Sequence, residues 1–74
     1  MTATIIDMDY RLVDTLNSDQ LETNDLIGLN DEVVKIIEIS PLRFGYALTY
    51  ENEYGEKDIV EIGDDEIFEL YILE

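Results

Sequence analysis

Carboxylates are the only abundant side chains in this sequence that could act in catalysis or bind a metal ion. The 74 residues include 19 Asp and Glu and four Lys and Arg, but no His and no Cys. Without His there is no side chain that ordinarily titrates near neutral pH, and without Cys there is no thiol nucleophile. The hydroxyls of Ser18, Ser40 and the threonines therefore lack an imidazole that would activate them. A hydrolase built on paired carboxylates needs a cleft that so short a chain scarcely offers, so we predict no catalytic residues and no enzymatic activity.

Metal and phosphate sites are also absent from the sequence pattern. Asp7 and Asp9 begin like a calcium-binding loop, but Arg11 and Leu12 occupy the positions where that loop needs an oxygen ligand and a glycine. The run Asp64–Glu66 follows a glycine, and acids at such a position are ordinary turn chemistry that would hold a divalent ion only weakly. No glycine-rich phosphate loop is present. We therefore predict no metal and no cofactor.

The excess of negative charge is the sharpest signal. The formal net charge is −15, and it is densest towards the C-terminus, where residues 44–74 carry ten acids and one base. A magnitude of about 2–8 keeps a small domain soluble, and a larger charge costs stability through self-repulsion. The excess favours an acidic surface that docks on a basic site of a nucleic-acid-associated protein, as a DNA or RNA mimic. Solubility alone, or adaptation to a salt-rich source, would give the same composition.

Two tyrosines complete the predicted interface. Tyr54 lies in an expected hairpin loop, and Tyr71 falls on the charged face of its strand, where cross-strand packing is the alternative to an anchoring role. Tyr10, Tyr46 and Tyr50 lie on apolar faces and are predicted to pack into the core. The candidate partner-binding residues are Glu51, Glu53, Tyr54, Glu56, Asp58, Glu61, Asp64, Asp65, Glu66, Glu69 and Tyr71.

The elements that must position these residues are strands. Alternation of apolar and polar residues predicts strands over 4–13, 44–51 and 67–73. The segment 33–39 is apolar on both faces, which fits a central strand covered on both sides or a barrel strand that bends between faces. Shorter strands are expected at 26–29 and 59–62. In the 44–51 segment, the residues expected to share the core face are Phe44, Tyr46, Leu48 and Tyr50.

Turn residues separate these strands. Asn30-Asp31 predicts a tight hairpin turn, Ser40-Pro41 is expected to end the central strand, and residues 52–57 form a hairpin loop. The segment 14–24 is expected to be a loop with a short helical turn near 18–22, which Ser18 would cap and which Leu16 and Leu21 would anchor.

Short strands in so small a chain predict one domain, residues 1–74, with an all-β fold. The expected architecture is a closed or nearly closed antiparallel SH3-like barrel of five to six strands, because closure removes exposed strand edges. The stretches 26–39 (LIGLNDEVVKIIEI) and 46–62 (YALTYENEYGEKDIVEI) resemble the meander of such barrels and are similar to small acidic proteins of bacteriophage genomes. The resemblance covers about two-thirds of the chain. It implies a phage-encoded protein and assigns no functional residue.

Charge and hydropathy also limit the partners. Direct binding of nucleic acid is disfavoured because phosphate contacts need a basic face, and no apolar run approaches the roughly 20 residues of a membrane span. The N-terminus (MTATIIDMDYRLVD) lacks the basic and apolar regions of a secretory signal, so we expect a cytoplasmic protein, in the host cytoplasm if phage-encoded. The leading hypothesis is an inhibitor or modulator that binds a basic host protein. The alternative is an assembly module of a virion or larger complex, which pairs through strand edges and tyrosines. The oligomeric state stays open.

Overall fold

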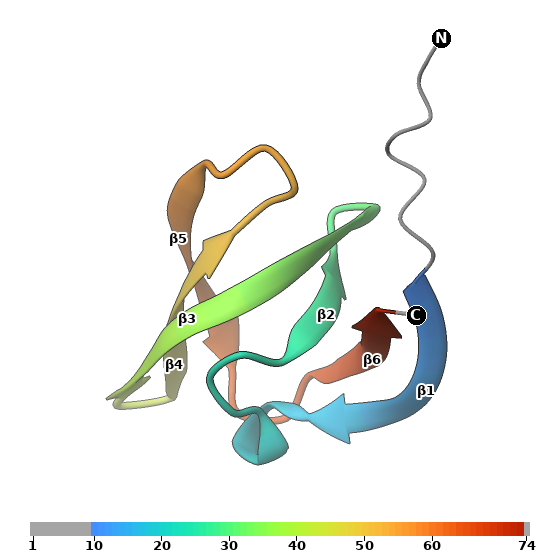
Figure 1. The fold of residues 1–74 in the computed structure, drawn as a ribbon. Coiled ribbons are helices and arrows are strands. Elements are labelled where there is room, and N and C mark those ends of the chain that lie inside the picture. Colours follow the sequence, from blue (N-terminus) through green and yellow to red (C-terminus); the bar gives the residue numbers. More distant parts are fainter. Residues whose placement is uncertain (1–9, 74) are drawn as a thin grey trace, which may run out of the picture.

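The fold is a single antiparallel sheet. A computed structural model describes residues 10–73 of the chain. Its six strands are β1 (Tyr10–Asn17), β2 (Leu26–Leu29), β3 (Glu32–Leu42), β4 (Gly45–Glu51), β5 (Lys57–Gly63) and β6 (Ile67–Leu73), with one 3-10 turn, η1 (Ser18–Gln20) (Figure 1). Their order in the sheet is β1-β6-β2-β3-β4-β5. The predicted small all-β antiparallel domain is confirmed.

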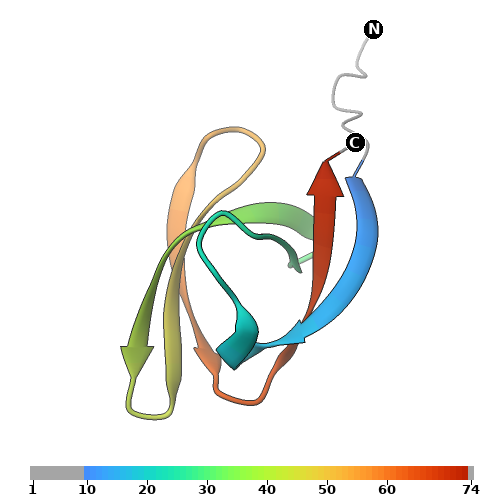
Figure 2. The same cartoon turned by 60° about the horizontal axis from the view of Figure 1, so that its bottom comes forward.

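The sheet curves around its core but does not close. Figure 2 shows β1 and β6 on one side of the molecule and β4 and β5 on the other, with β3 arching between them. Within residues 10–73, β1 and β5 are the two ends of the strand order and do not pair with each other. The expected barrel closure is therefore not formed. The gap lies between β5 and β1, because β6, which follows β5 after a short turn, crosses to pair with β1 and β2.

The core lies on the concave face. Ile27, Ile36 and Leu48 are fully buried. Tyr46 and Tyr50 pack against this core, as predicted for the apolar face of β4. Burial of such side chains supplies the main stabilisation of a small domain, at about 1.5–3 kcal/mol for each large apolar residue. The remaining core residues are Leu21, Val34, Ile62 and Phe68, with Leu16, Leu29, Ile39, Val60 and Leu70 packed around them.

Phe44 is not part of this core. Its side chain is 78% exposed, in the turn that joins β3 to β4. The predicted strand over 44–51 begins instead at Gly45, so the alternation that placed Phe44 beside Tyr46 does not extend through the turn. The guanidinium of Arg43 lies over the Phe44 ring, 6.0 Å from its centroid.

The hairpin turn at Asn30-Asp31 is confirmed. Both residues have positive φ values, +53° and +65°, the conformation that a two-residue turn needs to match the twist of its strands. The predicted strand end at Ser40-Pro41 is wrong, because β3 continues to Leu42. On the β2 side the hydrogen bonds of β3 stop at Ile36, so Pro41 lies where one side of the strand needs no donor.

β1 differs from its prediction at both ends. The part of the expected strand over 4–13 that precedes Tyr10 lies outside the described residues. At its other end β1 continues to Asn17, although the alternation breaks at Val13. A bulge between Leu12 and Asp14 absorbs one residue, so that pairing with β6 resumes with Asp14 opposite Leu70. Long-range pairing thus extends a strand that local alternation ends.

Ser18 joins η1 to the β5–β6 turn by hydrogen bonds. The structure places it inside η1, with Asn17 as the capping residue, so the predicted role of Ser18 as the cap is wrong. Its side chain is buried, donates to the carbonyl oxygen of Gly63 at 2.7 Å and accepts from the N–H of Glu66 at 3.0 Å. Its own N–H donates to the carbonyl oxygen of Glu66 at 2.8 Å. Leu21 is buried as expected.

Removing the Ser18 hydroxyl should destabilise the fold. Ser18→Ala leaves the Gly63 carbonyl and the Glu66 N–H without their partner, and we expect it to lower the free energy of unfolding by about 1–3 kcal/mol. Urea denaturation followed by circular dichroism measures the change. Ser40→Ala in β3 is the control, with an expected change within about 0.5 kcal/mol. Equal effects of the two substitutions would contradict the structural role of Ser18.

Candidate acidic interface

The predicted partner-binding acids separate towards the two ends of β5. Figure 1 shows the β2–β3 turn and the β4–β5 loop at one end of the molecule, and the β5–β6 turn with η1 at the other. β5 runs from Lys57 to Gly63, which is roughly 20 Å of extended chain. We call the first end the acidic loop end; it carries the predicted Glu53, Glu56 and Asp58 together with Asp31 and Glu32 of the β2–β3 turn.

The second group is partly occupied with local structure. Asp64, Asp65 and Glu66 form the β5–β6 turn, beside Asp19 of η1. The N–H of Gly63 donates to Oε2 of Glu66 at 2.7 Å, so this carboxylate closes its own turn. Within residues 10–73 there is no group of three or more His, Cys, Asp or Glu side chains placed to hold a metal ion. Asp64–Glu66 is therefore a turn rather than a ligand set.

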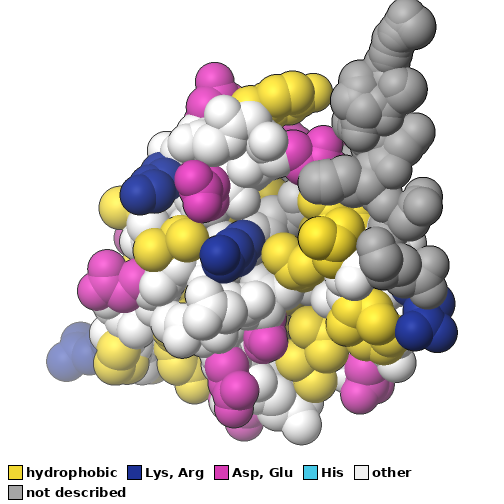
Figure 3. Space-filling model, viewed as in Figure 1, with side chains coloured by type: hydrophobic (Ala, Val, Ile, Leu, Met, Phe, Trp, Pro, Cys, Tyr) yellow, Lys and Arg dark blue, Asp and Glu magenta, His cyan; other side chains and the backbone are white. Residues whose placement is uncertain are grey.

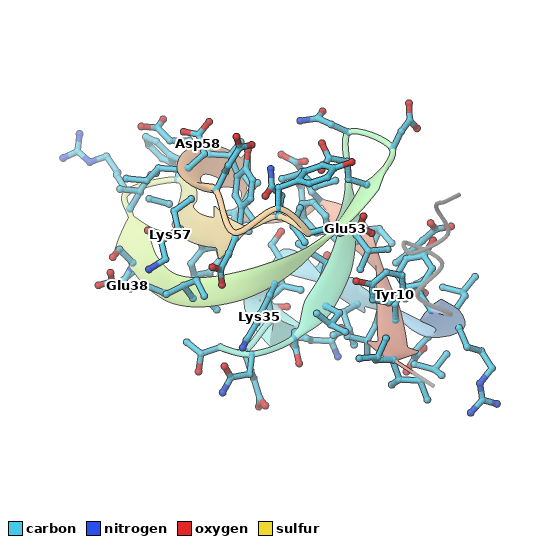
Figure 4. All side chains as sticks on the ribbon, turned by 45° about the horizontal axis from the view of Figure 1, so that its top comes forward. Tyr10, Lys35, Glu38, Glu53, Lys57 and Asp58 are labelled. Carbon is cyan, nitrogen blue, oxygen red and sulfur yellow. The ribbon has the colours of Figure 1, made fainter. Side chains whose placement is uncertain are left out.

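A groove lies between the two hairpin tips of the acidic loop end. Its volume is about 440 Å³, and Tyr50, Glu32, Glu56 and Asp58 are among the residues that line it. Lys57 is the one basic residue of its lining, against three carboxylates. Figure 4 shows Asp58, Lys57 and Glu53 around the β4–β5 loop. The groove therefore has a net negative charge.

A second groove continues the acidic surface around the β2–β3 turn. Its volume is about 370 Å³, and it is lined by Asp31, Glu32, Glu69 and Tyr71 among others. Glu32 belongs to both grooves. The structure thus connects Glu69 and Tyr71 to the acidic loop end through Asp31 and Glu32, two acids that the sequence analysis did not select.

Asn52 orders the β4–β5 loop. Its Oδ1 accepts from the backbone N–H groups of Tyr54 and Glu56, both at 2.9 Å, and its Nδ2 donates to Oε1 of Glu56 at 2.9 Å. Its N–H also donates to the carbonyl oxygen of Glu56, and Gly55 has a φ of +80°. Asn52 was not among the residues predicted from the sequence. An Asn at the start of a glycine-containing loop is the signal that could have found it.

Tyr54 stands at the tip of this loop. Its side chain is 77% exposed, which confirms the predicted exposure, and it lies between Glu53 and Glu56 in the chain. A tyrosine combines a large apolar ring with a polar tip and loses little conformational freedom on binding. The ordered loop therefore presents an aromatic side chain with carboxylates on both sides.

The negative charge of Glu51 is compensated by two neighbouring lysines. In the sheet register it lies directly between Lys35 of β3 and Lys57 of β5, so opposite charges face each other across both strand pairs. Glu38 shares the same outer face, as Figure 4 shows together with Lys35 and Lys57. The outer face of β3–β5 thus carries mixed charge, and Glu61 lies on it opposite Ala47. Of the predicted set, Glu56 and Asp58 line the first groove and Glu69 and Tyr71 line the second, whereas the other predicted residues, Glu51 and Glu61 among them, line neither.

Tyr71 packs across β2. Its hydroxyl donates to Oε1 of Glu69 at 2.8 Å, and a Cβ added to Gly28 would lie 3.4 Å from its ring. The hydrogen bond to Glu69, followed by burial and by the charge of that carboxylate, raises the pKa of Tyr71. Tyr71 is therefore held in place by cross-strand packing, and its ring borders the second groove.

The beginning of β1 lies within electrostatic reach of the β4–β5 loop. Burial, and after it the negative charge of Glu53, raises the pKa of Tyr10. Figure 4 shows Tyr10 and Glu53 on neighbouring parts of the molecule.

Comparisons with known proteins add no assignment. No family model, no curated protein sequence and no solved structure matches the chain. Among residues 10–73, no helix has the length and apolar character needed to span a bilayer. The candidate function therefore depends on the residues and their geometry.

Proposed function

We propose that this chain is a non-enzymatic binding protein whose acidic loop end docks on a basic surface of a nucleic-acid-associated protein. The observation that carries the proposal is the connected acidic surface formed by the two grooves around the β2–β3 turn, in which Lys57 is the one basic lining residue. The similarity of the strand pattern to small acidic phage proteins favours a phage-encoded inhibitor or modulator that competes with DNA or RNA.

Three features of the acidic loop end support this function. Its carboxylates attract a basic partner over a distance and raise the association rate. Tyr54 supplies an exposed aromatic side chain of the kind that dominates binding energy at interfaces. Asn52 fixes the loop before binding, which lowers the entropy lost when the complex forms.

An affinity pull-down from bacterial lysate tests the proposal. The immobilised chain is washed with a rising salt gradient, and the eluted proteins are identified by mass spectrometry. We expect a basic DNA- or RNA-binding protein to elute at moderate salt, because screening weakens charge-driven association. Added duplex DNA or RNA should displace it. A partner that stays bound at high salt, or that nucleic acid does not displace, would contradict the docking mode.

Assembly within a virion or larger complex is the second candidate function. One observation favours it: the sheet is open, so β1 and β5 are edge strands within residues 10–73. Edge strands present unpaired backbone groups to which another strand can add. Recovery of structural proteins instead of nucleic-acid-binding proteins in the pull-down would support this candidate.

A further inference from the structure

The two edge strands differ in character. In β1, Leu12 and Val13 are 50% and 44% exposed, and the adjacent Ile72 and Leu73 of β6 are 39% and 55% exposed. Figure 3 shows hydrophobic side chains gathered on the side of the molecule that carries β1 and β6. Within residues 10–73, β1 pairs only with β6, so its second edge has no strand beside it. Apolar side chains therefore surround an edge of β1 that no strand of residues 10–73 covers.

This side of the sheet is also the least acidic. β1 and β6 together contain one base, Arg11, and two acids, Asp14 and Glu69, for a net charge of −1 in a chain of −15. β5, the other edge, connects the acidic loop end to the acidic β5–β6 turn. A second copy of the same chain would be repelled from β5 and much less from β1.

The bulge in β1 places its two charges on one face. Arg11 lies opposite Ile72 and Asp14 lies opposite Leu70, and Ile72 and Leu70 share a face of β6 because they are two residues apart. Arg11 and Asp14 would point to opposite faces of a regular strand, since they are three positions apart. The extra residue between Leu12 and Asp14 removes that difference.

We propose that β1 pairs antiparallel with β1 of a second copy, about a twofold axis perpendicular to the sheet between Leu12 and Val13. That axis brings Arg11 of each copy opposite Asp14 of the other, so one surface is complementary to itself. The pairing joins the two sheets through the outer edges of their β1 strands, covers Leu12 and Val13, and forms two cross-strand ion pairs. In the second candidate function, assembly, the partner would then be a second copy of this chain. The dimer does not depend on docking to a basic protein.

Size and charge set the expected strength of this dimer. A single eight-residue edge buries less area than a standard interface of about 1,600 Å², so we expect a dissociation constant of roughly 10–100 µM. Two copies that each carry −15 repel one another, and salt screens this repulsion. Dimerisation should therefore strengthen with salt, whereas docking on a basic partner should weaken.

Sedimentation equilibrium of the full chain at 0.05 M and 0.5 M NaCl is the first measurement, over protein concentrations of roughly 10–300 µM. We expect a monomer–dimer equilibrium whose dissociation constant falls at least about threefold at the higher salt. Leu12→Lys should raise the dissociation constant about tenfold or more, because it places two ammonium groups at the twofold axis. Ile59→Lys is the matched control, since Ile59 is an exposed apolar residue of the other edge strand, and it should leave dimerisation unchanged.

A charge swap tests the register at constant net charge. In 0.5 M NaCl, Arg11→Asp and Asp14→Arg should each weaken the dimer, because like charges then face each other across the interface. The double variant should restore association to within about threefold of the original chain. A monomer at every concentration and salt, a stronger effect of Ile59→Lys than of Leu12→Lys, or no rescue by the double variant would overturn the proposal. Each of these results leaves the pull-down test of docking unaffected.

Discussion

Gly45→Ala should strongly lower the free energy of unfolding of this domain. Gly45 is buried at the start of β4, paired with Gly63 of β5, and has a φ of +154° that side-chain-bearing residues rarely adopt. A Cβ at this position would overlap the backbone carbonyl oxygen of Ile62 and approach the Cα of Gly63 to 3.1 Å. Because the obstruction is backbone, the β4–β5 pairing itself must shift.

The expected loss is about 3 kcal/mol or more, from backbone strain and displaced strand pairing together. A domain of this length has a total stability of about 4–11 kcal/mol, so the variant should unfold at a clearly lower urea concentration than the original chain. Urea denaturation followed by circular dichroism measures the loss. Gly28→Ala is the control, because its Cβ meets its nearest atom, in the Tyr71 ring, at an ordinary contact distance of 3.4 Å. Equal stability of the two variants would contradict the close approach of β4 and β5.

The sequence predicts the fold where alternation and turn chemistry are local. β4 and β6 follow the expected spacing closely, and β2 matches it, because each has one face on the core. Asn30-Asp31 adopts the two positive φ values that its residue types favour. In each case the decisive information lies within a few neighbouring residues.

The sequence does not predict features that depend on distant partners. β1 continues beyond Val13, where its alternation of apolar and polar residues ends, because β6 continues to pair with it across a bulge. β3 continues through Pro41 because no strand of residues 10–73 pairs with its other side there. The open sheet has the same origin, since whether β1 reaches β5 depends on how β6 crosses between β1 and β2. The local alternation of apolar and polar residues contains no information on any of these pairings.

The candidate interface shows the same limit. Composition and spacing select acids along the C-terminal half, but they cannot separate Glu56 and Asp58 from Asp64 and Asp65, which the sheet carries to opposite ends. They also miss Glu32, because a turn distant in sequence brings it beside the β4–β5 loop. The role of Asn52 depends on side-chain hydrogen bonds that only the folded loop defines.

Charge reversal at the acidic loop end should have the largest effect on binding. The triple variant Glu53→Lys, Glu56→Lys, Asp58→Lys replaces three carboxylates near the tip of the β4–β5 hairpin by ammonium groups. We expect it to weaken binding to the captured basic partner by about 100-fold or more, since each lost attraction becomes a repulsion of roughly 1 kcal/mol or more. Titration calorimetry with the purified partner in 0.1 M NaCl gives the affinity, and circular dichroism confirms that the variant is folded.

A second triple variant, with the same change in net charge at the other end of β5, distinguishes an effect of a local interface from an effect of the net charge. Asp19→Lys, Asp64→Lys, Asp65→Lys changes the net charge by the same amount but leaves the acidic loop end intact, and it keeps Glu66, whose carboxylate closes the β5–β6 turn. A directed interface predicts a loss of less than about tenfold for this variant, because its charges act only through long-range attraction that salt screens over about 10 Å. Equal losses for both variants would mean that the total charge, and not the acidic loop end, attracts the partner. The charge would then act as a diffuse attraction without a defined interface, and the pairing of β1 would become the main candidate for a specific interaction.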